Sequence, residues 1–398
     1  MIRYLDNAAS TELCEEAKEA ILGAVGVYGN PSSTHRMGAE AKRLLESSRE
    51  TVRDALGAGS GQGGALVFTA SGTEANCTAV LGSFRAKKRK RDGSEWILIG
   101  DGEHPSVEKS AETLEAEGCR LVRIPTAGGE LDIGFLDRTL GECEKAGGTV
   151  VCAAFMLVNN ETGAIYDVRR AFSAVKAKFP DAVAHCDAVQ GFGRIRFTPS
   201  ALGADTLSVS AHKIHAPRGA GALYIGPTAL KRKNIAPLIP GGGQESGLRS
   251  GTENLISTAA FAAAARAASA NFDANREIAA RLRRRLSDGL YELSAAGVSV
   301  KKPARAVDDI VNITLPGIRS ETMLNFLSGE GICVSAGSAC SAYSKKKSSA
   351  LTAFGCTDGE IDSSIRVSTS HLNKEDDIDA FLDALSRGIA RLARGGRR

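Results

Sequence analysis

Short apolar runs alternate with segments of helical periodicity up to about residue 253, and this alternation limits the fold more than any other feature of the chain. The strand-like runs are Ala65–Thr69, Trp96–Gly100, Val150–Met156, Ala182–Cys186 and Thr206–Ser210. Amphipathic stretches such as Ala41–Leu56 lie between them, with apolar residues mostly on one face. Such repetition predicts an α/β fold with a mainly parallel sheet flanked by helices.

The pattern changes in the last third of the chain. Glu253–Leu293 is rich in alanine and arginine and predicts one or two long helices. Three later runs, Val307–Leu315, Ile332–Ser335 and Ile365–Ser368, look like strands separated by helices. We therefore expect a large domain over residues 13–255 and a smaller α+β domain over residues 256–398. Residues 1–12 are expected to pack against the smaller domain.

Composition excludes several classes of function. The 398 residues include 50 basic and 46 acidic side chains, and the resulting net charge of +4 is too small to indicate a nucleic-acid or membrane partner. No apolar run approaches the ~18 residues that a membrane span requires. The nine cysteines are scattered and form no CxxC pair, which argues against a disulfide framework or a zinc site. We expect a soluble protein of the reducing cytoplasm.

Polar residues follow each predicted strand. The turn Ser71-Gly72-Thr73 comes directly after the first strand and opens a helix, so it presents free backbone N–H groups and hydroxyls to an anion such as phosphate. Taken alone, this turn is equally compatible with an ordinary helix N-cap. His104 follows the second strand, and by itself it could be a plain loop histidine.

The remaining strands end in an amide, an acid and a lysine. Asn160 lies in a tight turn after the third strand, Asp187 follows the fourth, and Lys213 follows the fifth. Because parallel strands present their carboxyl ends at one edge of a sheet, we expect these residues to meet. A lysine for a Schiff base, a carboxylate for a pyridine nitrogen and donors for a phosphate are what pyridoxal 5'-phosphate needs.

Ordered motifs along almost the whole chain resemble one enzyme family. These motifs are YLDNAAST, FTASGTEAN, EHPS, NNETG, HCDAVQGFG, SAHKIHAPRG, GGGQESGLRSGTEN, SAGSACS and SSIRVS. Together they are similar to those of the NifS/IscS-type cysteine desulfurases, within the class V aminotransferase superfamily of fold type I pyridoxal-phosphate enzymes. The resemblance implies conversion of L-cysteine to L-alanine, with the sulfur passed to an acceptor protein for iron–sulfur cluster or thio-cofactor assembly.

The resemblance also implies roles for residues around the cofactor. Lys213 would hold pyridoxal phosphate as a Schiff base and move the substrate Cα proton. Asp187 would pair with the ring nitrogen, His104 would stack on the ring and assist proton transfer, and Gln190 would reach the phenolic oxygen. The residues expected at the phosphate are Gly72, Thr73, Ser210 and His212.

Three further residues have roles implied at the edges of the site. Asn160 and Arg366 are expected near the substrate carboxylate, which a planar guanidinium can bind through two hydrogen bonds. Thr252 is expected to reach the cofactor phosphate of a second subunit, which implies a homodimer.

Cys340 is the residue that would distinguish a desulfurase from other members of the superfamily. It lies in the segment SAGSACS, and the resemblance makes it the thiolate that takes sulfur from L-cysteine as a persulfide. Small polar neighbours and the Lys345–Lys347 run are typical of a mobile, electropositive loop. The alternative for this residue is a buried structural thiol.

Other functions stay open at the level of sequence. A selenocysteine lyase or another class V aminotransferase-type enzyme would share most of these motifs. A sulfur-transfer component that works only with a partner, or an inactive scaffold, is a further alternative. The sequence does not identify the sulfur acceptor, and it assigns no role to Lys345–Lys347 or to the basic C-terminal tail.

Overall fold

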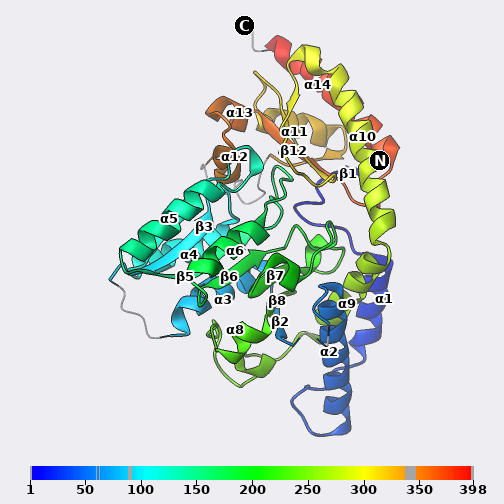
Figure 1. Cartoon of the computed structure of the whole chain (residues 1–398). Coiled ribbons are helices and arrows are strands. Elements are labelled where there is room, and N and C mark those ends of the chain that lie inside the picture. Colours follow the sequence, from blue (N-terminus) through cyan, green and yellow to red (C-terminus); the bar gives the residue numbers. More distant parts are fainter. Residues whose placement is uncertain (1, 60, 62, 88–91, 337–346, 396–398) are drawn as a thin grey trace.

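The computed structural model describes residues 2–59, 61, 63–87, 92–336 and 347–395 (Figure 1). Its centre is a seven-stranded sheet whose strands follow the order β2 (Ala65–Thr69), β8 (Gly221–Ile225), β7 (Thr206–Ser210), β6 (Val183–Asp187), β5 (Thr149–Met156), β3 (Glu95–Gly100) and β4 (Arg120–Ile124). Only β8 among these strands is antiparallel to its neighbours, so the other six point the same way. The predicted mainly parallel sheet is confirmed.

The five strands predicted for the large sheet agree with the structure to within a residue at each end. Strand β4 was not predicted, and in the C-terminal part β10 (Ile310–Thr314) and β11 (Ile332–Cys333) are shorter than the predicted runs Val307–Leu315 and Ile332–Ser335. The difference with the largest consequence is at β6, which extends to Asp187, so that this carboxylate belongs to the last residue of the strand instead of the first residue after it. It pairs there with Met156 on β5. The carboxyl ends of β2, β3, β5, β6 and β7 therefore meet at one edge of the sheet, as the strand directions require.

Helices cover both faces of the large sheet. On one face lie α3 (Gly72–Arg85) and α4 (Pro105–Ala116), which bury apolar residues against the sheet in one core cluster. On the other face a larger cluster includes side chains of α2 (Arg36–Ala55), α5 (Ile133–Lys145), α6 (Val168–Lys178) and α9 (Leu255–Ala270). Shorter elements complete this part: α1 (Glu15–Val25), α7 (Pro199–Leu202), α8 (Pro227–Lys231) and the 3₁₀ turns η2 (Ala127–Gly129), η3 (Ala211–Lys213) and η4 (Glu245–Gly247).

A second, smaller sheet lies in the C-terminal part. Its strands follow the antiparallel order β12 (Ser364–Ser368), β10 (Ile310–Thr314) and β9 (Ser299–Val300). The surrounding helices are α10 (Phe272–Glu292), α11 (Ser320–Gly329), α12 (Ser349–Phe354), α13 (Asp358–Asp362) and α14 (Glu375–Gly395), with the 3₁₀ turn η5 (Ser294–Ala296) after α10. Figure 1 shows α10 running from α9 along one side of the molecule to α14.

The N-terminal segment belongs to this C-terminal part by its packing. Strand β1 (Arg3–Tyr4) pairs in parallel with β11 (Ile332–Cys333), and Leu5 is buried in the core cluster of the small sheet. The division between residues 255 and 256 stays a prediction. Because α9 packs against α1 and α2, whereas α10 packs against α14, the packing favours a division near Asn271, between α9 and α10.

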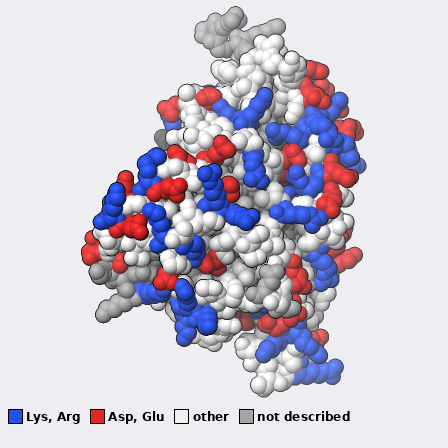
Figure 2. Space-filling model, in the orientation of Figure 1, with Lys and Arg blue, Asp and Glu red and all other residues white. Residues whose placement is uncertain are grey.

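The surface of the described residues carries both signs of charge. Figure 2 shows Lys and Arg interspersed with Asp and Glu over the visible face, without a single-sign field. Within the described ranges, no helix combines the length and the apolar character that crossing a bilayer demands.

Candidate active site

A cavity of about 250 Å³ lies at the carboxyl edge of the large sheet. Ten of the residues predicted for the site line it: Gly72, Thr73, His104, Asn160, Asp187, Gln190, Ser210, His212, Lys213 and Arg366. They come from five strand ends of the large sheet and from β12 of the small sheet. The cavity is therefore shared between the two sheets.

Lys213 is held at the cavity by the N-terminal segment. It closes the 3₁₀ turn η3 directly after β7, and its Nζ atom donates to the backbone carbonyls of Ala8 at 2.6 Å and Ala9 at 2.7 Å. The carbonyl of Ala8 also accepts a hydrogen bond from Gln190 Nε2 at 2.9 Å. The segment that packs on the small sheet thus positions two predicted cofactor residues.

The N-terminus of α3 has the geometry of an anion cradle. Ser71 caps the helix by accepting from the backbone N–H of Glu74. A Cβ at position 72 would lie 2.7 Å from Val189 Cγ2, so any larger residue than glycine would force Val189 to shift. Ser210 Oγ is buried close to Gly72 and has no hydrogen-bond partner within the described part of the chain. Free helix N–H groups facing a spare hydroxyl suit a phosphate.

Asp187 is buried and oriented by two donors. Its Oδ2 accepts from Asn76 Nδ2 at 2.6 Å, and its Oδ1 accepts from the backbone N–H of Val189 at 3.0 Å. A carboxylate oxygen has two lone-pair sites, so Asp187 keeps acceptor capacity for a donor inside the cavity. This is the arrangement expected of a partner for a protonated ring nitrogen.

The two histidines of the cavity are held neutral. Burial lowers the pKa of His104, and the charge of Lys213 acts in the same direction while Asp187 opposes it. Burial, reinforced by Lys213, lowers the pKa of His212 to about 4. Both side chains are therefore neutral imidazoles near pH 7, each with one ring N–H to donate and one nitrogen to accept.

Arg366 brings a buried cation to the cavity. Its Nη1 donates to the backbone carbonyl of Asn160 at 2.9 Å, and its Nη2 donates to Asp6 Oδ1 at 2.8 Å. Its Nε has no partner among the residues that the structure describes. A buried, positively charged group with a spare N–H is suited to a carboxylate ligand.

Two predicted residues remain to be placed. Thr252 is exposed and lies outside this cavity. Cys340, with Lys345 and Lys346, lies outside the described residues, so the structure does not test its predicted position. The chain is described again from Lys347, which forms an ion pair with Asp358. Next to it, Ser348 Oγ donates to the buried carboxylate of Glu161 at 2.6 Å, one residue after Asn160.

Further residues position the predicted ones without being predicted themselves. Asn76 belongs to the motif FTASGTEAN and lies one helical turn after Gly72, so it faces the same way. Asp6, which holds Arg366, lies in YLDNAAST, and no local pattern pairs it with a residue 360 positions away. The same is true of the carbonyls of Ala8 and Ala9.

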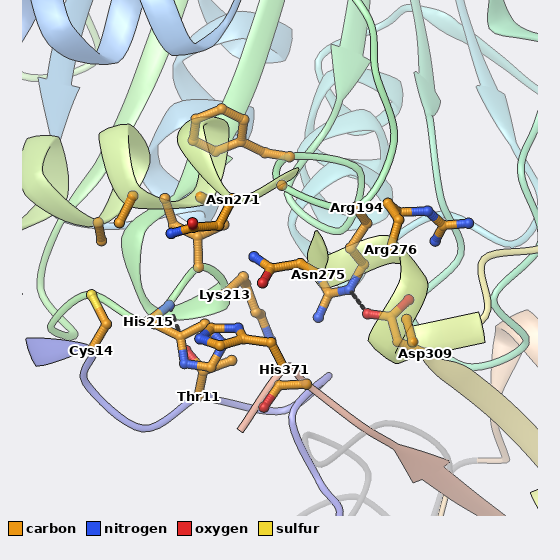
Figure 3. A pocket seen from close by; sticks show the side chains of 18 of the residues that line it. Thr11, Cys14, Arg194, Lys213, His215, Asn271, Asn275, Arg276, Asp309 and His371 are labelled. Carbon is orange, nitrogen blue, oxygen red and sulfur yellow. Dashed lines mark hydrogen bonds and ion pairs between the residues drawn. The ribbon is translucent and has the colours of Figure 1, made fainter. Parts of the chain in front are cut away.

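A second cavity, of about 100 Å³, also has Lys213 in its wall (Figure 3). Arg194 pairs with Asp309 at one side of it through Nε and Oδ2 at 2.5 Å. At another side the ring centroids of His215 and His371 lie 4.5 Å apart in an edge-to-face arrangement. Cys14 lies on the wall as well.

The first cavity fits pyridoxal phosphate by its donor set. Lys213, Asp187 and the α3 cradle could hold the aldehyde, the ring nitrogen and the phosphate, and the unpartnered Ser210 Oγ and Gln190 Oε1 could take further polar contacts. In the described ranges there is no group of three or more His, Cys, Asp or Glu side chains suited to a metal ion.

Comparisons with known proteins agree with this geometry. The profile of the family described as Aminotransferase class-V matches residues 3–381. A "NifS/IcsS protein homolog" of Lactobacillus delbrueckii subsp. bulgaricus is 34% identical, over 96% of this chain and 95% of that protein. An "IscS-like cysteine desulfurase" of Mycobacterium tuberculosis is 33% identical, over 98% and 97%. A solved "NIFS-LIKE PROTEIN" superimposes with a TM-score of 0.87 at 30% identity, over 98% of this chain and 100% of that one.

Proposed function

The chain belongs to the class-V aminotransferase family, in its NifS/IscS-type group, and from this we infer that it is a cysteine desulfurase that converts L-cysteine to L-alanine. The observation that carries the inference is the single cavity that Lys213, Asp187, His104 and Arg366 share. A lysine, a ring-nitrogen partner and a carboxylate site are the parts that amino-acid chemistry on pyridoxal phosphate requires.

Pyridoxal phosphate, when bound, supplies an electron sink for the bond changes at the substrate Cα. The α3 N-terminus, with Thr73, Ser210 and His212, would hold its phosphate, and Asp187 would keep its ring nitrogen protonated. Lys213 would anchor it covalently and, once released, would move the substrate proton. Arg366 would bind the substrate carboxylate, with Asn160 beside it.

Cys340 is the proposed sulfur acceptor within the chain. Its thiolate would attack the sulfur of bound L-cysteine, so that the carbon–sulfur bond breaks, a sulfur–sulfur bond forms and the substrate carbon takes up a proton. One L-cysteine and one thiol then give one L-alanine and one persulfide. The persulfide would be passed to an acceptor protein for iron–sulfur cluster or thio-cofactor assembly.

A homodimer in the reducing cytoplasm is part of the proposal. The exposed position of Thr252 leaves it available to a second copy, where it would reach the partner's cofactor phosphate. A reducing compartment suits a thiolate that must return to its free form after each turnover. The cysteines in the described part of the chain form no disulfide, which is compatible with that compartment.

The test is an assay of the purified protein with L-cysteine and a reductant. We expect sulfide and alanine in equal amounts, and a persulfide on Cys340 in mass spectra taken without reductant. Cys340→Ser should still bind L-cysteine but should form no alanine, because a hydroxyl cannot hold sulfur as a persulfide. Alanine production at the wild-type rate by this variant would remove Cys340 from the reaction and leave a lyase that releases sulfur directly.

A further inference from the structure

A chain of buried hydrogen bonds lies behind the active-site cavity and ends on two residues that line it. It starts at Thr206 on β7, passes through His185 on β6 and reaches Asn76 on α3. From Asn76 one branch leads to Asp187, and the other leads through Ser106 to His104. His185 and Thr206 are completely buried, so these bonds have no competition from solvent.

The direction of the Asn76 amide follows from its neighbours. Nδ2 lies 2.6 Å from Asp187 Oδ2 and 2.9 Å from Ser106 Oγ, and a carboxylate can only accept. Oδ1 therefore points the other way, where it lies 3.0 Å from His185 Nε2. His185 must carry its proton on Nε2, and its Nδ1 accepts from Thr206 Oγ1 at 2.9 Å.

The second branch acts together with the backbone N–H of Ser106 on the protonation of His104. Ser106 Oγ accepts from Asn76, so its own hydroxyl proton is available to His104 Nδ1 at 2.8 Å. The backbone N–H of Ser106 donates to the same Nδ1 at 3.2 Å. Two donors at Nδ1 leave no room for a proton there, and the neutral ring of His104 carries its proton on Nε2.

We propose that His185 and Asn76 are positioning residues that set, through one amide, both the orientation of the Asp187 carboxylate and the tautomer of His104. The donor at His185 Nε2 prevents the amide from turning over. A turned amide would place Oδ1 against Asp187, two acceptors facing each other in a buried site, and it would leave Ser106 without its donor. The residues assigned to the ring nitrogen and to the face of the ring are thereby coordinated by one amide.

This inference rests on the proposed function, but the protonation of the His104 ring can be measured on the protein alone. Its direct test is nuclear magnetic resonance of protein labelled with ¹⁵N in its histidine rings, with the His104 signals identified by their loss in His104→Gln. We expect a protonated Nε2 and an unprotonated Nδ1 for His104. A proton on Nδ1 of His104 would overturn the proposal without the need for any further variant.

A pair of substitutions at His185 tests the coupling. His185→Phe removes the donor but keeps a ring, so we expect a mixture of His104 tautomers and about tenfold weaker binding of pyridoxal phosphate to the apo-protein. His185→Gln can place an N–H near the position of Nε2 and should restore both properties to within about twofold of wild type. If His185→Phe keeps the wild-type tautomer of His104 and the wild-type affinity for pyridoxal phosphate, the proposed coupling through Asn76 is wrong.

Two outcomes separate this proposal from the proposed function. A protein that shows the expected tautomer and binds pyridoxal phosphate, yet makes no alanine from L-cysteine, would overturn the function and leave the network in place. A protein that makes alanine but carries the His104 proton on Nδ1 would do the reverse. Should His185→Phe fail to fold, Asn76→Ser gives the same readout, because it removes the amide without adding bulk.

Discussion

The two cavities that meet at Lys213 use polar residues in different ways. On the strand-end side, several buried polar atoms keep hydrogen-bond capacity, including Ser210 Oγ, Gln190 Oε1 and Arg366 Nε. On the other side, most charged groups are paired with each other: Arg194 pairs with Asp309, whose Oδ1 alone in that pair has no partner among the described residues, and Arg276 pairs with Asp308 at 2.7 Å. Spare capacity marks the side built to bind a ligand, and internal pairing marks the side that holds segments of the chain together.

Lys213 lines both cavities, and its substitution is expected to have the largest effect on activity. Lys213→Ala should abolish covalent attachment of the cofactor and lower the rate of alanine formation by roughly 10³-fold or more, because both the anchor and the proton carrier are lost. Borohydride reduction followed by peptide mass analysis should find the cofactor on Lys213 in the wild-type protein. Cofactor attached to another lysine would contradict the assignment.

Arg366 in the first cavity and Arg194 in the second allow a matched test of the comparison. Arg366→Lys keeps the charge but loses the planar set of donors, so we expect KM for L-cysteine to rise and kcat/KM to fall about 100-fold. Steady-state kinetics measure both values. An unchanged KM would mean that the substrate carboxylate is bound elsewhere.

The corresponding change in the second cavity should affect stability instead. Asp309→Ala leaves the buried Arg194 without its partner and should lower the free energy of unfolding by about 3 kcal/mol or more. Denaturant unfolding measures this loss, while kcat/KM per folded molecule should stay within about threefold of wild type. A large fall in kcat/KM with normal stability would give the second cavity a part in catalysis.

His215 adds a dependence on pH to the second cavity. Burial, with a contribution from His371, lowers the pKa of His215 to about 4 in the folded protein, against about 6.5 in the unfolded chain. Between these values the unfolded chain binds a proton that the folded protein does not, so stability falls as pH drops from 6.5 to 4, by at most about 1.4 kcal/mol per pH unit for this group.

His215→Asn isolates the contribution of His215 to the pH dependence of stability. Asparagine tolerates the positive φ of 68° at this position and can replace the Nδ1–H donor to the carbonyl of Glu12. Unfolding measured at pH 4.5, 5.5 and 6.5 should show a shallower slope than in wild type. An identical slope would show that the pKa of His215 does not differ between the folded and unfolded states.

Cys14 should have the smallest effect. Burial raises the pKa of its thiol, so little thiolate is present near pH 7. Cys14→Ser should therefore change the rate of sulfide release by less than about twofold. A loss comparable to that of Cys340→Ser would make Cys14 a carrier of sulfur and would give the second cavity a chemical function.

The same contrast explains how much could be predicted from sequence. The strand-end residues Thr73, His104, Asp187 and Lys213 come directly at or after predictable strands, so their meeting at one edge follows from the parallel sheet. Asn76 is harder, because its role depends on the direction of an amide that only His185 and Asp187 together determine.

The second cavity could not be predicted, because its wall joins distant segments. Its residues come from 11–16, 192–194, 213–215, 264–279, 309 and 369–371, and no local pattern relates these segments. The same limit applies to Asp6 and the carbonyls of Ala8 and Ala9 in the first cavity. Sequence motifs predict contacts that a single strand or turn creates, whereas these contacts depend on how the two sheets pack.

The N-terminal segment links the order of synthesis to the completion of the site. Asp6 reaches Arg366 across 360 residues, and Ala8 and Ala9 hold Lys213 across more than 200. On a ribosome, residues 3–9 emerge long before β11 and β12, with which they pair. The large sheet can form while translation continues, but the carboxylate site has to wait until β12 has left the exit tunnel. Nascent chains would therefore acquire the lysine pocket first and the capacity to hold an amino acid last.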